Sequence, residues 1–319
     1  MAEEQKRVCV TGAGGFIASW LVKLLLARGY QVHGTIRDPG DVKKNAHLFE
    51  LDGASENLRL FKAELLDYDS LLRAIKGCAG VFHLASPVYP PNVVDQEVDV
   101  IEPAVKGTVN VLNACVEAKV KRVIVVSSAA AVANNPNWPK DRVMDETCWS
   151  DNDFQRKNER WYAISKTLSE SKAVEFGKKG ILDVVTVCPT VCLGPILQST
   201  INSSSEVLIN LLKEGEEERE NMLRRIVDVR DVADALLLTY EEPECEGRYI
   251  CTAHMVMTRD LVEKLKSMYP GYSYPKRFGA AEDAQKMSSE KLQKLGWKYR
   301  PLEETLMDSV QCYQQSGIV

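Results

Sequence analysis

A tyrosine and a lysine four residues apart, Tyr162 and Lys166, form the pair in this chain best suited to move a proton. On a helix, positions i and i+4 share a face, so the ammonium would lie beside the phenol. A phenol with a pKa of about 10 is a poor acid at neutral pH, and a nearby cation lowers that pKa. Ser128 ends an apolar segment, where its hydroxyl could hold a carbonyl oxygen. We therefore expect Ser128, Tyr162 and Lys166 to form a catalytic triad.

A glycine-rich turn near the N-terminus predicts a second kind of site. Gly12 allows a tight turn, Gly15 lets a pyrophosphate approach the backbone, and Ala18 lets the following helix lie close on the strand. The spacing is Gly-x-x-Gly-x-x-Ala, with a strand pattern before it and a helix pattern after it. We expect contacts to a dinucleotide from Thr11, Gly12, Gly15, Phe16 and Ile17, and from Tyr162 and Lys166, the lysine at the nicotinamide ribose.

The segment after the second expected strand indicates which nicotinamide is bound. In a dinucleotide fold, an acidic residue there prefers the free 2′-hydroxyl of NAD, whereas arginine pairs with the 2′-phosphate of NADP. Arg37 occupies this position, and Lys43 and Lys44 follow it. The alternative assigns the ribose to Asp38 and leaves Arg37 as surface charge. Three cations around one acid favour a phosphate, so NADP or NADPH is the predicted cofactor.

Strand and helix patterns alternate through the first half of the chain. Strands are predicted over Arg7–Thr11, Gln31–Arg37, Leu58–Lys62, Gly80–Leu84, Arg122–Ser127 and Asp183–Val187. Helices are predicted over Phe16–Arg28, Tyr68–Lys76, Gln96–Ala118 and Glu159–Lys178, with a kink or late start at Pro103. Such alternation implies βαβ units, and hence an α/β fold with a Rossmann-type, doubly wound parallel sheet.

The ends of parallel strands gather around a ligand, so further cofactor contacts are expected after the third and fourth strands. Those residues are Glu64, Leu65, Ala85, Ser86 and Pro87.

The pattern becomes irregular after Pro189. Loops and short helices are expected at Gly194–Pro195, Ser203–Ser205 and the acidic run Glu214–Glu220, and a helix and a strand at Val232–Tyr240 and Arg248–Cys251. We predict an NADP-binding Rossmann domain over residues 1–188, to which roughly residues 226–252 return. Residues 189–319 are predicted to form mainly a smaller substrate-binding region.

Composition narrows the classes of partner. The chain has 319 residues and a net charge of −5, without a dense basic tract, which argues against nucleic acid and anionic membranes. No apolar run is long enough to span a bilayer, and the polar start is unlike a secretory signal, so we expect a cytoplasmic protein. Nine scattered cysteines indicate buried thiols in a reducing compartment. None of the four histidines has a ligand spacing to another, so no metal is expected.

The whole set of motifs resembles the extended short-chain dehydrogenase/reductases, over nearly the full length of the chain. It is most similar to the plant branch with cinnamoyl-CoA, dihydroflavonol, and cinnamaldehyde or phenylacetaldehyde reductases. The matching segments are Val10–Val22, Arg37–Pro39, Gly80–Pro87, Val126–Ser128, Asp145–Ser150, Trp161–Glu170, Ser288–Leu292 and Pro301–Thr305. The resemblance implies an NADPH-dependent carbonyl reductase of phenylpropanoid metabolism, with a role in lignin biosynthesis and with Ser128, Tyr162 and Lys166 as its triad. It also implies cofactor contacts at Arg37, Lys44, Pro189 and Thr190.

Departures from the subfamilies indicate the substrate. Cinnamoyl-CoA reductases read Asn-Trp-Tyr-Cys-Tyr before the catalytic lysine, and only Trp161 and Tyr162 match here. A histidine and a lysine that help those enzymes hold coenzyme A phosphates align with Val207 and Asn210. We therefore expect reduction of a free phenylpropanoid aldehyde, such as coniferaldehyde or cinnamaldehyde, to its alcohol by a monomer or homodimer. An apolar slot for the aromatic ring is predicted from Val88, Tyr89, Ala131 and Ile201.

Four alternatives stay open. Reduction of a hydroxycinnamoyl-CoA thioester to the aldehyde would use the same triad and cofactor. A dihydroflavonol-type ketone reductase carries an asparagine after the serine, and Asn134 and Asn135 lie close to that position. A sugar-nucleotide epimerase or dehydratase usually retains NAD, which Arg37 argues against. A non-catalytic nucleotide-binding module predicts a damaged triad, whereas all three residues are present here.

Overall fold

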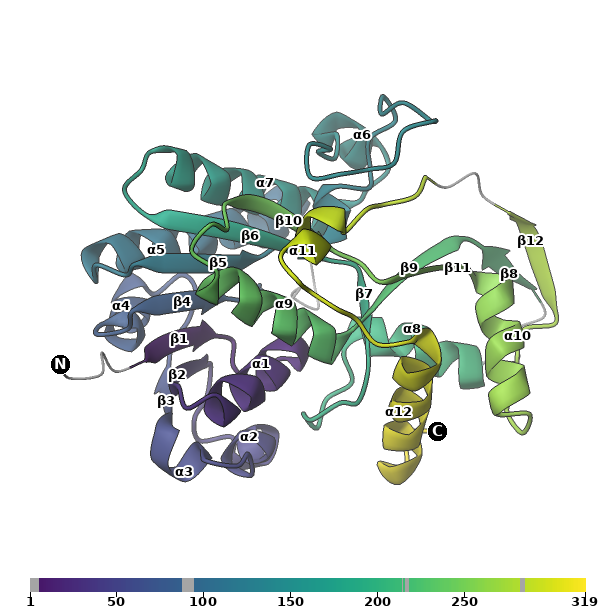
Figure 1. Cartoon of the computed structure of the whole chain (residues 1–319), viewed down its shortest axis with the longest axis horizontal. Coiled ribbons are helices and arrows are strands. Elements are labelled where there is room, and N and C mark those ends of the chain that lie inside the picture. The colour runs from purple at the N-terminus through teal and green to yellow at the C-terminus, as the bar shows by residue number, and fades with distance from the viewer. Residues whose placement is uncertain (1–5, 88–94, 214, 216–217, 282–284) are drawn as a thin grey trace.

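A parallel sheet of seven strands forms the centre of the computed structural model, which describes residues 6–87, 95–213, 215, 218–281 and 285–319. The strand order is β10-β6-β5-β4-β1-β2-β3, and every neighbouring pair is parallel (Figure 1). The bounds are β1 Arg7–Thr11, β2 Gln31–Ile36, β3 Leu58–Lys62, β4 Gly80–His83, β5 Arg122–Val126, β6 Asp183–Pro189 and β10 Gly247–Cys251. The predicted α/β fold with a doubly wound parallel sheet is confirmed.

Helices cover both faces of this sheet, because successive side chains of a strand point to opposite faces. In β1, Val8 and Val10 pack into one core with α1 (Phe16–Ala27) and α9 (Val229–Glu241). Cys9, between them, packs into a second core, together with helices α4 Tyr68–Ile75, α5 Glu102–Glu117 and α7 Trp161–Lys178. Strands β1, β4, β5 and β6 each contribute apolar side chains to both cores, as a parallel sheet covered on both faces requires.

The C-terminal part of the chain builds a second, smaller lobe. Its strands are β7 Val191–Leu193, β9 Leu223–Asp228 and β11 His254–Met257 in one sheet, and β8 Glu218–Asn221 with β12 Arg277–Ala281 in another. Its helices are α8 Ser203–Lys213, α10 Thr258–Met268 and α12 Leu302–Gln315, and they share a separate apolar core. In Figure 1 this lobe lies beyond the ends of the central strands, on the right.

Short helices complete the chain. They are α2 Val42–Phe49, α3 Ala54–Asn57, α6 Asn152–Lys157 and α11 Glu290–Lys294, a π-helical turn at Glu97–Ile101 and a 3-10 turn at Ala129–Ala131. The π-helical turn precedes α5, which starts at Glu102 with a proline in its first turn. The chain is therefore already helical before Pro103, and the irregularity predicted there as a kink or late start is a π-helical turn that passes into α5.

The sequence prediction was wrong in the irregular part. Ser203–Ser205, expected in a loop or short helix, begins the eleven-residue helix α8. The end of the acidic run, expected in a loop or short helix, is strand β8, which pairs with β12 some sixty residues later. In both cases the element is stabilised by distant packing, which local sequence patterns do not report.

Candidate cofactor and active site

The glycine turn is held firmly against the end of β4. Gly12 has a φ of +68°, and a Cβ there would lie 3.1 Å from the Cα of Ala85. The Thr11 hydroxyl accepts hydrogen bonds from the backbone N–H groups of Leu84 and Ala85, at 3.1 and 3.0 Å. A side chain at this position would be strained by the backbone conformation and crowded against Ala85, so glycine lets the turn lie directly on the segment after β4.

The N-terminus of α1 fits a pyrophosphate. Gly15 is its N-cap residue, no side chain caps the helix, and no acidic residue lies in the first turn. The first N–H groups of a helix have no intrahelical partner and carry a partial positive charge. This arrangement suits an anion, and the predicted contact residues Gly15, Phe16 and Ile17 all lie at it.

The residues after β2 fit a phosphate on the ribose. Arg37 and Lys44 are exposed, and their side chains form no hydrogen bond or ion pair within the described part of the chain. The Asp38 carboxylate accepts a hydrogen bond from the Gly40 N–H at 2.9 Å, so it is used within its own turn. Of the two alternatives for this position, the geometry favours Arg37 over Asp38 as the partner of the ribose.

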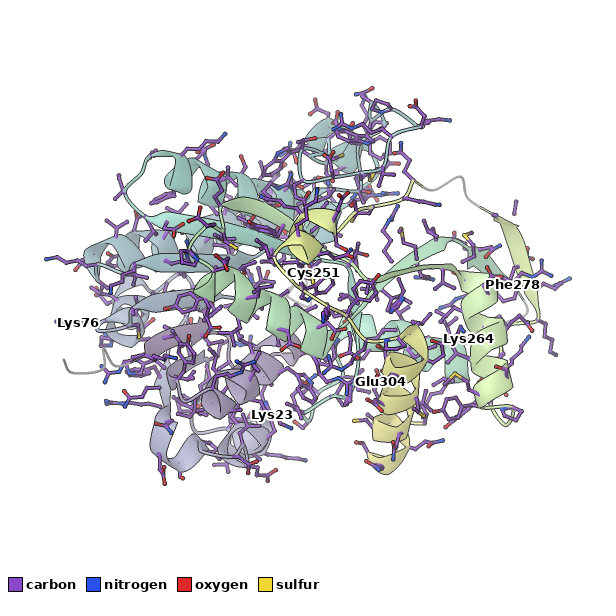
Figure 2. All side chains as sticks on the ribbon, in the orientation of Figure 1. Lys23, Lys76, Cys251, Lys264, Phe278 and Glu304 are labelled. Atoms are coloured by element: carbon purple, nitrogen blue, oxygen red, sulfur yellow. The ribbon has the colours of Figure 1, made fainter. Side chains whose placement is uncertain are left out.

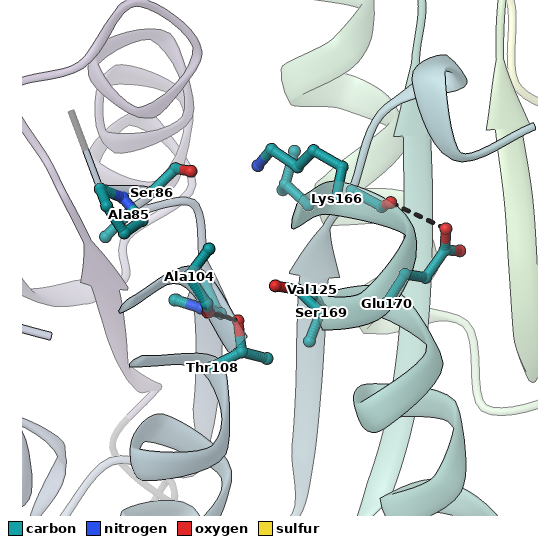
Figure 3. A pocket seen from close by; sticks show the side chains of 12 residues that line it. Ala85, Ser86, Ala104, Thr108, Val125, Lys166, Ser169 and Glu170 are labelled. Atoms are coloured by element: carbon teal, nitrogen blue, oxygen red, sulfur yellow. Dashed lines mark hydrogen bonds between the residues drawn. The ribbon is translucent and has the colours of Figure 1, made fainter. Parts of the chain in front are cut away.

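The three predicted triad residues come from β5 and α7. Ser128 follows β5, and its hydroxyl accepts a hydrogen bond from the Ala130 N–H at 3.1 Å. Tyr162 lies in the first turn of α7 and is 45% exposed. The Lys166 Nζ lies 5.9 Å from the Tyr162 ring centroid, on the same helix face. Figure 3 shows Lys166 extending from α7 toward Ser86, one of the predicted cofactor contacts.

A small cavity of about 20 Å³ lies beside Lys166 and reaches His83 and Ser86. His83 is buried, with Nδ1 2.9 Å from the Thr11 hydroxyl and Nε2 3.3 Å from that of Thr108. Burial, and then the charge of Lys166, lowers the pKa of His83 to about 3. The imidazole is therefore neutral at physiological pH and connects the glycine turn to α5 by hydrogen bonds.

A buried ion pair fixes α7 on the sheet, and the sequence prediction missed it. Glu170, one turn after Lys166, accepts hydrogen bonds from Ser127 at 2.8 Å, Thr186 at 2.7 Å and Arg248 at 2.8 Å. Arg248 also donates to the carbonyl groups of Glu146 and Cys148. An arginine that starts a strand in an otherwise apolar stretch was the available signal for a buried partner.

The other predicted contacts lie around these elements. Glu64 and Leu65 follow β3. Leu65 packs against Gly107 of α5 so closely that a Cβ on Gly107 would lie 2.8 Å from the Leu65 Cβ. Pro189 ends β6, and the Thr190 N–H donates to the Cys251 carbonyl group. Ala131 is fully buried and Ile201 is exposed. Val88 and Tyr89 lie outside the described residues.

The cysteines are free thiols, eight buried and Cys312 half-buried. Figure 2 shows Cys251 near the middle of the molecule, with Lys76 at its outline. Burial raises the pKa of the eight buried thiols, for Cys78 and Cys192 to about 12. Among the described residues there is no group of three or more metal-ligating side chains, and no helix with the length and apolarity to cross a membrane.

Known proteins share this architecture. Residues 8–250 match the model of the NAD dependent epimerase/dehydratase family. The chain is 45% identical to cinnamoyl-CoA reductase 1 of Petunia hybrida, over 97% of this chain and 92% of the relative. Among solved structures, alfalfa vestitone reductase superposes with a TM-score of 0.86 at 35% identity, covering 98% and 99% of the two chains. A yeast methylglyoxal/isovaleraldehyde reductase complexed with NADPH superposes at 0.84 and 26% identity, over 98% and 100%.

These relatives confirm the predicted resemblance to plant reductases and the predicted oxidoreductase class. The family match extends from β1, through the glycine turn and the triad residues, to β10. The chain therefore belongs to the NAD dependent epimerase/dehydratase family.

Proposed function

We propose that this chain is an NADPH-dependent reductase of a hydroxycinnamoyl-type carbonyl group, with the coenzyme A thioester as substrate and the aldehyde as product. The observation that supports the proposal is the Lys166 ammonium beside the Tyr162 ring on α7. It is accompanied by the uncapped N-terminus of α1 and by Arg37, whose side chain has no partner among the described residues. The similarity to cinnamoyl-CoA reductases over 97% of the chain supports the thioester, which the sequence analysis kept only as an alternative.

The cofactor would lie along the carboxyl ends of the central strands. The N–H groups at the start of α1 would bind its pyrophosphate, and Arg37 and Lys44 its 2′-phosphate. Lys166 would hold the nicotinamide ribose, close to Ser86. When bound, NADPH supplies a hydride to the carbonyl carbon.

The triad would handle the oxygen of the carbonyl group. Ser128 would donate a hydrogen bond to this oxygen, and Tyr162 would give it a proton as negative charge develops. Lys166, on the same helix face, would stabilise the phenolate that remains. With a thioester, the carbon–sulfur bond then breaks, the oxygen proton is lost, and the thiol of coenzyme A leaves with a proton.

A second candidate is the reduction of a free phenylpropanoid aldehyde to its alcohol. Val207 and Asn210 favour it, because these half-buried positions of α8 offer no charge to coenzyme A phosphates. The aldehyde needs only the triad, the hydride and an apolar slot, for which Ala131 and Ile201 remain predictions.

NADPH consumption by purified protein separates the two candidates, with feruloyl-CoA and coniferaldehyde offered in parallel. We expect turnover of feruloyl-CoA, with coniferaldehyde accumulating as product. Consumption with coniferaldehyde alone would establish the second candidate instead. Absence of turnover with both, in protein that binds NADPH, would contradict the proposed function.

A further inference from the structure

A large, positively charged hollow lies outside the triad and the cofactor surface. This basic hollow has a volume of about 720 Å³ and is lined from within residues 133–144 and by Phe154, Arg160, Arg225 and residues 285–286. It lies between the loop after β5, the segment around α6 and strand β9, and so between the two lobes.

The charges around the basic hollow are strongly unbalanced. Its described lining carries five cations, Lys140, Arg142, Arg160, Arg225 and Lys286, and one carboxylate, Asp141. Arg142 is neutralised by Asp145 at 2.9 Å, outside the lining. No carboxylate of the described chain pairs with Lys140, Arg160 or Lys286. Such an excess of cations around one cavity attracts a multiply charged anion.

Arg225 is the unusual member of this group. Its Nη2 donates to the Gln285 carbonyl group at 2.5 Å, but its Nε is shielded from solvent and has no hydrogen-bond partner among the described residues. Burial lowers the pKa of Arg225, and no acid offsets this effect. A shielded, unpaired guanidinium N–H is unfavourable unless something else supplies the acceptor.

Two residues that line the basic hollow, Asn134 and Arg160, lie close in the chain to residues of the triad. Arg160, whose Nη1 donates to the Asn134 side chain, is the residue before α7, two positions before Tyr162. Asn134 follows Ser128 by six residues, and its N–H donates to the Ser150 hydroxyl at 3.0 Å. A substrate whose carbonyl group lies at Ser128 and Tyr162 could therefore extend a long, flexible arm into the hollow.

We propose that the basic hollow binds the phosphate groups of the coenzyme A part of the substrate. The proposal rests on the proposed function, because it supposes a thioester at the triad. It also accounts for the uncharged Val207 and Asn210 on α8: the cations that meet the phosphates come from β9 and the start of α7. Guanidinium groups form paired hydrogen bonds with phosphate oxygens, and Arg225 and Arg160 provide two.

A phosphate chain fits better than a single carboxylate. Four cations that have no ion-pair partner among the described residues surround the hollow, Lys140, Arg160, Arg225 and Lys286. One carboxylate would leave most of them uncompensated. The volume also exceeds what a carboxylate needs and lies within the range of sites for large organic ligands.

Calorimetric titration of the NADP⁺-loaded protein with free coenzyme A tests the proposal without any turnover. NADP⁺ keeps coenzyme A from the cofactor site. Coenzyme A should bind, and its Kd should rise about tenfold or more in Arg225→Gln and in Arg160→Gln, because each loses a charge-assisted hydrogen bond. Arg160 is exposed, so its variant should fold even if Arg225→Gln does not. Lys157→Gln, an exposed cation of α6 outside the lining, should bind coenzyme A like the parent.

Kinetics with two thioesters then locate the effect. Arg225→Gln and Arg160→Gln should lower kcat/KM about tenfold more for feruloyl-CoA than for feruloyl-pantetheine, which lacks the phosphates. An equal loss with both thioesters, or an unchanged Kd for coenzyme A, would overturn the proposal. Turnover of coniferaldehyde but of neither thioester would reject the proposed thioester reaction, whereas the titration would still decide whether the hollow binds coenzyme A.

Discussion

Two shielded arginines, Arg248 and Arg225, lie in opposite electrostatic surroundings. Arg248 forms an ion pair with the fully buried Glu170, donates to two backbone carbonyl groups and stacks on Trp149 at 3.6 Å. Arg225 has one backbone acceptor and an Nε without a partner. The first is satisfied by the protein itself, whereas the second lines a cavity among other cations. The difference separates an arginine whose hydrogen bonds are satisfied within the fold from one that has donors left for the ligand proposed above.

Helix α7 connects these two surroundings. Arg160 precedes it at the basic hollow, Tyr162 and Lys166 lie in its first turns, and Glu170 follows on the face that meets the sheet. The ion pair therefore fixes the helix that positions the triad, while the open end of the same helix borders the hollow.

Tyr162→Phe tests catalysis without changing the surroundings of Arg248 or Arg225. It removes the proton donor but none of the hydrogen bonds around Glu170 or Arg225, so kcat should fall about 10²- to 10⁴-fold with unchanged stability. NADPH oxidation with feruloyl-CoA measures the loss, and thermal unfolding is the control. Near-normal turnover of this variant would contradict the assignment of Tyr162 as proton donor.

Arg248→Met removes the buried ion pair between Arg248 and Glu170. It leaves the Glu170 carboxylate buried without its counter-charge, so the free energy of unfolding should fall by about 3–5 kcal/mol. Urea titration measures the change. The double variant Glu170→Met/Arg248→Met removes both charges and should recover most of the loss. A single variant as stable as the parent would mean that the ion pair does not hold α7.

The buried His83 makes the stability of the fold depend on pH. Its folded pKa of about 3 lies below the ordinary value of about 6.5, so the unfolded chain binds more protons between these limits. The free energy of unfolding is therefore unaffected by the protonation of His83 above about pH 6.5 and falls as the pH decreases below it. Between pH 7.5 and 5.5 the parent should lose about 1.4 kcal/mol more stability than His83→Gln. Parallel losses in the two proteins would show that the folded imidazole is protonated like an exposed one.

Arg225→Met should change stability much less than Arg248→Met. It removes a shielded guanidinium whose Nε has no partner, so we expect a change within about 1 kcal/mol of the parent, in either direction. Urea titration under the conditions used for Arg248→Met gives the comparison directly. A loss as large as that of Arg248→Met would mean that Arg225 stabilises the fold as much as Arg248 does.

The sequence predicted the central sheet well because its signals are local. The strand over residues 7–11 has the predicted bounds. Its apolar run ends at Gly12, whose positive φ turns the chain out of the strand. Tyr162 and Lys166 were proposed from their spacing on one helix, and Ser128 from its place at the end of a strand. Arg225 and Glu170 could not be predicted in the same way, because their surroundings come from β9, β10 and residues far away in the chain. Strand β8 was missed for the same reason, since its partner β12 lies far along the chain.

Strand β10 has a consequence for the order in which the chain becomes structured. It pairs with β6 at the edge of the main sheet, yet the second lobe's β7, α8, β8 and β9 intervene between the two in sequence. During synthesis, β6 must therefore wait with an unpaired edge, and Glu170 without Arg248, until residue 251 has left the ribosome. Pairings of such high contact order form slowly, and an unpaired strand edge is a template for pairing with other chains. The β6 edge is therefore the part of the nascent sheet most exposed to aggregation.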